Sequence, residues 1–178
     1  MKVSVHTLGR RTGASMELVR TFDAPAHMGT EFLSVPEGSP MNAQLRIDAV
    51  SEGLFVSGDV TVQVRGLCVR CLEPLDGEYT ATIEELFLLP EAVIRAVDEG
   101  DEDAQEMYTT DGEILDLEGP FRDAIVAEMP FQPLCSPDCK GLCPTCGIKL
   151  SEAEEGHSHD VIDPRFAMLA QLLEENEE

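Results

Sequence analysis

The chain has 178 residues, and its 35 Asp and Glu against 12 Lys and Arg give a formal charge of −23. Such a charge repels phosphate backbones at long range, which disfavours broad nucleic-acid binding and favours basic partners: ribosomal proteins, basic peptides or RNA already coated by cations. Hydrophobic residues make up 43% of the chain and aromatic residues 5%. That is enough for one aliphatic core, to which a bound metal would add stability.

The N-terminal residues contain no apolar run of signal-peptide length, and no stretch approaches the roughly 20 apolar residues of a membrane helix. We therefore expect a cytoplasmic protein without membrane contact. In a reducing cytosol, closely paired cysteines are metal ligands more often than disulfides.

Residues 1–90 are predicted to be mainly antiparallel sheet. Apolar and polar residues alternate at Leu45, Ile47 and Ala49, at Val60, Val62 and Val64, and at Tyr79, Ala81 and Ile83; Leu54–Val56 and Met16–Phe22 are two further strands. Turns are expected at Ser51–Gly53 and Gly66–Pro74, and a loop at Ser34–Pro40. These strands predict a meander or partial barrel.

Residues 91–115 are predicted to be an acidic mobile loop. No Lys or Arg occurs between Ala96 and Phe121, and carboxylates cluster around Gly100. A segment of this composition rarely buries enough apolar surface to be ordered. Its carboxylate spacing lacks the pattern of an EF-hand, so we expect a solvated loop, which could also dock a basic partner.

Residues 116–178 are predicted to hold a helix, a cysteine-rich zinc segment and a C-terminal helix. Leu117, Phe121, Ala124 and Ile125 recur at helical spacing, and the second helix begins at Asp163–Pro164 with Phe166, Leu169, Ala170 and Leu173 on one face. We therefore expect a single α+β domain: an antiparallel meander or partial barrel with two helices and a C-terminal zinc-binding lobe.

The chemistry of the chain is concentrated in four ligand pairs. They are Cys68 and Cys71, Cys135 and Cys139, Cys143 and Cys146, and His157 and His159. Eight soft or borderline ligands satisfy two tetrahedral zinc sites, and sites with four protein ligands are structural. Nearby Arg65, Arg70 and Lys140 are expected to neutralise the thiolates, or to touch RNA locally.

The pairs can combine in more than one way. We assign Cys68, Cys71, Cys135 and Cys139 to one zinc, and Cys143, Cys146, His157 and His159 to the other. The long loop that this requires costs about 3 kcal/mol, against about 10–16 kcal/mol contributed by a structural zinc. In the alternative pairing, Cys68 and Cys71 join Cys143 and Cys146, which leaves Cys135 and Cys139 with the histidines. The His157–His159 pair could also be an ordinary polar loop.

Enzymatic patterns are weak in this sequence. Cys139, Cys143 and Cys146 have the spacing of radical S-adenosylmethionine enzymes, but too few residues follow to build such a barrel. No phosphate loop or nucleophile elbow is present. We therefore expect no catalytic residue and no small-molecule substrate.

Several segments carry a family resemblance. They are Leu67–Leu72, Ile114–Leu117, Pro133–Cys135 with Cys139–Gly147, and Asp163–Arg165. Together they resemble the YceD family of large ribosomal RNA subunit accumulation proteins, from about Leu45 to Leu173. Many relatives have Cys-x-Cys where this chain has His157-Ser158-His159, a change that keeps the ligand capacity.

The resemblance implies a non-enzymatic cytosolic factor for synthesis, processing or stability of large-subunit (23S) rRNA. Combined with the charge, it leads us to expect contact with a basic ribosomal protein or a pre-50S particle, with RNA contact at most local. Two other classes stay open at this point: a zinc- or redox-responsive thiol protein, and an adaptor for another cytosolic complex.

Overall fold

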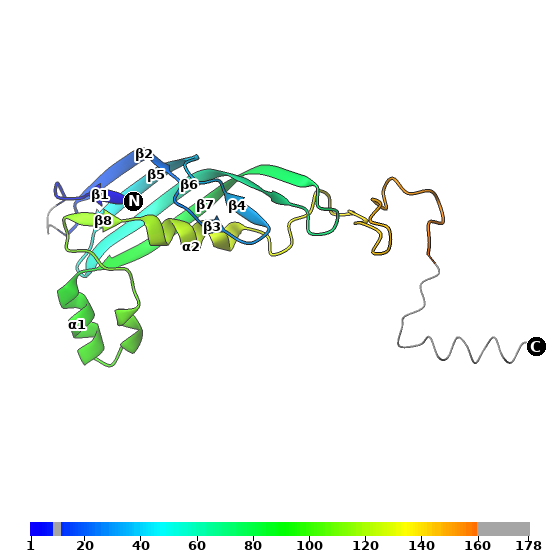
Figure 1. The fold of residues 1–178 in the computed structure, drawn as a ribbon. Coiled ribbons are helices and arrows are strands. Elements are labelled where there is room, and N and C mark those ends of the chain that lie inside the picture. The colour runs from blue at the N-terminus through cyan, green and yellow to red at the C-terminus, as the bar shows by residue number, and fades with distance from the viewer. Residues whose placement is uncertain (9–11, 160–178) are drawn as a thin grey trace, which may run out of the picture.

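The computed structural model describes residues 1–8 and 12–159, which form an α+β fold built on a curled antiparallel sheet (Figure 1). The strands are β1 (Lys2–Ser4), β2 (Ser15–Asp23), β3 (Met28–Gly29), β4 (Leu33–Val35), β5 (Pro40–Ala49), β6 (Gly53–Leu67), β7 (Pro74–Leu88) and β8 (Ile114–Asp116), and the helices are α1 (Pro90–Asp98) and α2 (Glu118–Glu128). The predicted fold class, a partial barrel with two helices, is confirmed; α2 is one of the two predicted helices, whereas α1 was not predicted.

The centre of the sheet is the antiparallel meander β5–β6–β7. β2 pairs with the outer side of β5, while β4 pairs with β6 beyond the end of β5 and carries β3. The β6–β7 hairpin is in register from Gly53↔Leu88 to Leu67↔Pro74. Its turn therefore projects beyond the shorter strands and carries the first cysteine pair to one end of the molecule.

Alternating burial gives the sheet one apolar face, on which α2 and the β1–β8 pair lie (Figure 1). Helix α2 buries Phe121 and Ile125, and the Phe121 ring meets Phe22 of β2 edge-on at 5.6 Å. Pro120 lies in its first turn, where a missing amide is tolerated, and Pro130 follows its end. This end directs the chain back toward the β6–β7 turn.

Two predicted strands, at Leu54–Val56 and Val60–Val64, are one continuous strand, β6. Gly58 interrupts the apolar alternation, which is why the sequence reads as two pieces. Its φ is +138°, and a Cβ there would lie 2.2 Å from the carbonyl oxygen of Gln44 on β5. The glycine lets the neighbouring strand approach, so the strand passes through without a break.

The acidic segment predicted as a mobile loop over residues 91–115 contains regular structure, which corrects the prediction of a loop. It begins in α1 and continues through a 3₁₀ turn at Glu102–Gln105 to β8, which pairs with β1. Pro90 opens α1, and Ala92 packs with Leu88 and Ala104 in a small apolar cluster. A few small, scattered apolar residues are enough to pack this segment. The composition does not reveal them, because carboxylates are far more abundant in the segment.

The predicted helix from Asp163–Pro164 lies outside the described residues. Within the residues that the structure describes, no helix is both long enough and apolar enough to cross a membrane.

Candidate metal centres

The first group of ligands, here called the buried quartet, comprises Cys68, Cys71, Cys135 and Cys139. Cys68 and Cys71 lie in the turn of the β6–β7 hairpin, and Cys135 and Cys139 lie in the segment after α2. Cys68, Cys71 and Cys139 are buried, whereas Cys135 is exposed. The quartet thus joins parts of the chain that are 64 and 71 residues apart.

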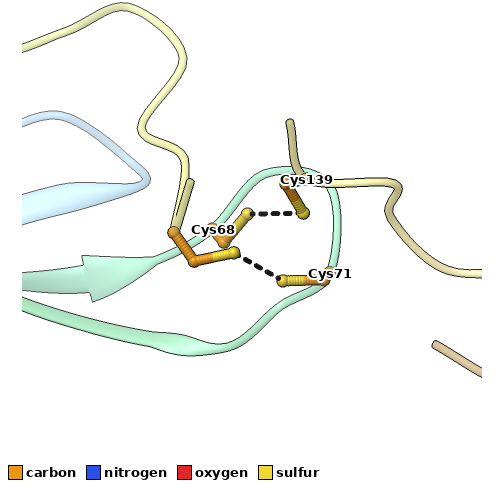
Figure 2. A group of neighbouring side chains, drawn as sticks. Cys68, Cys71 and Cys139 are labelled. Atoms are coloured by element: carbon orange, nitrogen blue, oxygen red, sulfur yellow. Dashed lines mark hydrogen bonds between the residues drawn. The ribbon is translucent and has the colours of Figure 1, made fainter. Parts of the chain in front are cut away.

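The sulfur atoms of the buried quartet have the spacing of a metal tetrahedron. The Sγ atoms of Cys68 and Cys139 are 3.7 Å apart and those of Cys71 and Cys135 are 3.5 Å apart (Figure 2). A zinc ion with bonds of about 2.3 Å to four sulfurs separates them by about 3.8 Å. All four cysteines are free thiols, so the donor set suits a soft-liganded divalent ion.

Backbone hydrogen bonds hold the two halves of this quartet in place. Cys68 N–H donates to Glu73 O at 2.8 Å and Cys68 O accepts from Leu72 N–H at 2.9 Å, which closes the turn. Across the halves, Val69 N–H donates to Pro133 O at 3.0 Å and the Arg70 guanidinium donates to Cys139 O at 2.9 Å. The ligand geometry is therefore built into the fold.

The thiols of this quartet differ in acidity. Burial opposes ionisation of Cys68, but hydrogen bonds from the backbone amides of Cys135, Cys71 and Arg70 outweigh it and lower its pKa to about 6. Hydrogen bonding to the thiols of Cys71 and Cys139, together with burial, raises the pKa of Cys135 to about 12. Four thiolates would repel one another at this spacing, and a bound divalent ion would supply the opposite charge.

The predicted neutralising cations have separate roles. Arg70 reaches the buried quartet through Cys139, and Lys140 lines a hollow beside Cys71 and Cys135. Arg65 instead pairs with Asp76 at 3.1 Å on the exposed face of the sheet. Lys149, which the sequence did not single out, pairs with Glu73, and this pairing, with a smaller contribution from nearby Cys71, raises the pKa of Lys149.

The second group, here called the lobe quartet, comprises Cys143, Cys146, His157 and His159. Nε2 of His157 and of His159 lie 3.4 Å and 3.2 Å from Sγ of Cys146, and 3.1 Å from each other. A tetrahedral zinc with bonds of about 2.3 Å to sulfur and about 2.0 Å to nitrogen gives edges of about 3.3–3.8 Å. These ligands fit a Cys₂His₂ site after a small expansion.

A tight turn presents the two cysteines of the lobe quartet. Gly147 N–H donates to Cys143 O at 2.9 Å, with Gly147 at φ +74°, and Cys143 N–H donates to Ile148 O at 2.8 Å. Amides of Cys146 and Thr145 point at the Cys143 thiol and, with His157, lower its pKa to about 6. This is the geometry of a zinc knuckle.

The structure brings together the same two quartets that the sequence analysis preferred. The alternative pairing, with Cys68 and Cys71 beside Cys143 and Cys146, is not formed, because Cys135 and Cys139 complete the first quartet. The histidines lie with Cys143 and Cys146 and not in a separate loop. That the eight residues bind metal stays a prediction.

The sequence of this chain matches a known protein family. The sequence profile described as large ribosomal RNA subunit accumulation protein YceD matches residues 56–173, two thirds of the chain. The chain belongs to the YceD family. The YceD match includes both quartets and, from residue 56 onward, the hairpin that carries the first of them.

The YceD-family chain is also similar to proteins of mycobacteria and of Bacillus subtilis. It is 43% identical to an uncharacterized protein of Mycobacterium tuberculosis, over 97% of this chain and 81% of the relative. An uncharacterized protein of Mycobacterium leprae is 42% identical over 93% of this chain and 74% of its own length. YlbN of Bacillus subtilis is 27% identical over 79% of this chain and 78% of YlbN. No solved structure matches the chain significantly.

Proposed function

We propose that this YceD-family protein is a non-enzymatic cytoplasmic factor that supports the accumulation of large-subunit (23S) rRNA. The observation that carries the proposal is the family match over residues 56–173, because the family is described by that process. The match includes both candidate metal centres, so they belong to the part of the chain that the family shares.

The proposed role of the quartets is structural. Thiolate and imidazole ligands favour zinc, and four protein ligands leave no coordination position for water or substrate. Zinc in such a site does not generate a nucleophile. Two zinc ions would fix the end of the β6–β7 hairpin and the lobe that follows, and so hold a contact surface in one shape.

The proposed partner is a basic ribosomal protein or a pre-50S assembly intermediate. A formal charge of −23 favours approach to a positively charged surface and opposes approach to bare RNA. Any RNA contact is then confined to cations such as Arg70 and Lys140 near the buried quartet. Ribosomal assembly in the cytoplasm offers basic proteins and partly covered rRNA together.

Deletion of the gene and complementation with the full chain test this function. We expect deletion to lower the 23S-to-16S rRNA ratio and to accumulate particles that sediment before the mature large subunit. The wild-type chain should restore both and co-sediment with those particles. An unchanged rRNA ratio, or recovery of free RNA without ribosomal protein, contradicts the proposal.

Exposure of Cys135 and Cys146 favours a second candidate, a redox-responsive thiol protein. Zinc-bound structural thiolates resist alkylation until a chelator removes the metal, whereas sensor thiols react in the native state. Counting alkylated cysteines by mass spectrometry, before and after chelation, distinguishes the two roles.

A further inference from the structure

Phe131 is an exposed aromatic residue that neither the fold nor the quartets use. Its side chain is 98% exposed, although a Phe side chain carries about 150–250 Å² of surface that water solvates poorly. Pro130 and Pro133 flank it, and Val69 N–H fixes the carbonyl of Pro133 at 3.0 Å. The ring is therefore presented on a restrained backbone, at small entropic cost for binding.

A largely apolar hollow lies beside the segment that carries this residue, although Phe131 itself is not part of its lining. It is lined by Val64, Tyr79 and Leu75 of the β6–β7 hairpin and by Pro130 and Pro133 on either side of Phe131. The hollow exists because α2 ends at Glu128, before the apolar face of the hairpin does. Gly77 of β7 adds to it, since a Cβ at this position would have only ordinary contacts, at 3.6 Å or more.

The surroundings of the hollow are acidic. Residues 73–79 and 128–138, two of the segments that border it, carry five carboxylates and no Lys or Arg: Glu73, Asp76, Glu78, Glu128 and Asp138. Asp76 pairs with Arg65 and Glu73 pairs with Lys149, whereas Glu78, Glu128 and Asp138 form no ion pair among the described residues. Of the arginines at this end, Arg65 pairs with Asp76 and Arg70 donates to Cys139 O, while Lys140 lies in a separate hollow beside Cys71 and Cys135. A second copy of a chain with charge −23 is disfavoured here, and so is a phosphate backbone.

We propose that Phe131 and the adjoining hollow form a docking surface for a Lys- and Arg-rich polypeptide segment that carries a bulky apolar side chain. Phe131 packs against the partner while the partner's apolar residue enters the hollow, and the carboxylates attract its cations. The identification of this segment as part of a large-subunit ribosomal protein rests on the proposed function. The buried quartet positions the surface, because it fixes the segment that begins at Pro133 against the hairpin turn.

The test uses the full zinc-loaded chain and proteins extracted from salt-washed large ribosomal subunits. A photoreactive benzoylphenylalanine replaces Phe131, and cross-linked peptides are identified by mass spectrometry. We expect cross-links to a Lys- and Arg-rich segment of a large-subunit protein. Affinity for that protein should fall about tenfold or more in Phe131→Ala, a loss of about 1.4 kcal/mol for each factor of ten.

Two variants make the test specific. Val19→Ala removes a side chain that is 78% exposed on β2, away from the hollow, and should bind as the wild type does. Gly77→Val fills the hollow from the sheet side at a position that tolerates a side chain, and should weaken binding while Phe131 is intact. Circular dichroism and zinc content check that each variant is folded.

Equal affinity of Phe131→Ala and wild type overturns the docking surface. So do cross-links from position 131 only to rRNA or to a second copy of the chain, and so does absence of capture by the wild-type chain. If deletion still lowers 23S rRNA in any of these cases, the proposed function stands without this surface. If Phe131-dependent capture is found but rRNA is unchanged by deletion, the surface stands and the proposed function fails.

Discussion

The two quartets place similar ligands in different structural settings. The buried quartet joins the β6–β7 turn to a segment 64 to 71 residues later, and three of its four thiols are buried. The lobe quartet gathers its ligands from residues 143–159, and Cys146 and His159 are exposed. With a bound metal, the first would be a long-range cross-link of the domain, and the second would organise a local lobe.

Because of this difference, we expect the buried quartet to affect the stability of the whole fold and the lobe quartet to affect only the order of its own loop. A cross-link between distant segments contributes its metal-binding free energy to the tertiary fold, whereas a local site mainly orders its own loop. The lobe contacts the hairpin turn through few interactions, among them Leu142 N–H to Arg70 O at 3.1 Å and the Lys149–Glu73 ion pair. Loss of the lobe metal should therefore leave the sheet intact.

The largest expected effect is the difference in free energy of unfolding between Cys68→Ser and Cys143→Ser, which both replace a buried thiol. Cys68→Ser should lower the free energy of unfolding by about 3–5 kcal/mol, because buried thiolates lose their cation and the hairpin loses its cross-link. Cys143→Ser should lower it by less than about 1 kcal/mol, because the lobe is local. Urea unfolding in zinc-buffered solution measures both, and equal losses contradict the comparison.

The next effect is on metal stoichiometry. His157→Ala should reduce bound zinc from two equivalents to one after mild chelation, while the thermal midpoint of the body changes little, because three ligands hold the exposed ion weakly. His6→Ala, a histidine outside both quartets, is the matched control and should keep two. Elemental analysis decides, and two zincs at full occupancy in His157→Ala remove His157 from the site.

A smaller, kinetic difference is expected during chelation. Under a limiting chelator, the exposed Cys146 should be alkylated before the buried Cys68, because the lobe opens without disturbing the sheet. Time-resolved mass spectrometry of peptides from the two quartets gives the order. Simultaneous loss of both metals would show that the lobe and the hairpin open as one unit.

The smallest effect concerns the link between the two regions. Lys149→Ala removes a partly exposed ion pair with Glu73 and should cost no more than about 1 kcal/mol. Zinc content should stay at two, while amide exchange rises in the lobe and not in β6 or β7. Lys140→Ala is the control, since Lys140 forms no ion pair among the described residues. Faster exchange along the whole hairpin would show tighter coupling than the contacts indicate.

The sequence allowed a prediction of the sheet and of the ligand partition for local physical reasons. Alternation at Leu45–Ala49 and Tyr79–Ile83 reflects one buried face, and that pattern survives in β5 and β7. The ligand pairs have spacings that bring two donors together, and pairing Cys143 and Cys146 with the histidines nearest to them in sequence favoured the observed grouping.

What the sequence did not reveal depends on distant contacts. β1 and β8 pair across more than a hundred residues, as in Lys2↔Asp116, and neither is long enough to show a period. Ala92 is the only buried residue of helix α1, so the acidic residues around it dominate the hydrophobic pattern of this segment. The hollow beside Phe131 follows from where α2 ends relative to β7, which no local motif encodes.

The separation of Cys71 from Cys135 has a consequence during synthesis. At about 5–20 residues per second, a ribosome needs about 3–13 s to add the 64 residues between them. During that interval Cys68 and Cys71 lie in the β6–β7 turn without their partners Cys135 and Cys139, while the strands up to β7 can already pair. If a metal binds the buried quartet, this end can close only after Cys135 and Cys139 have been made, and the supply of metal at that moment would set how many new chains complete it.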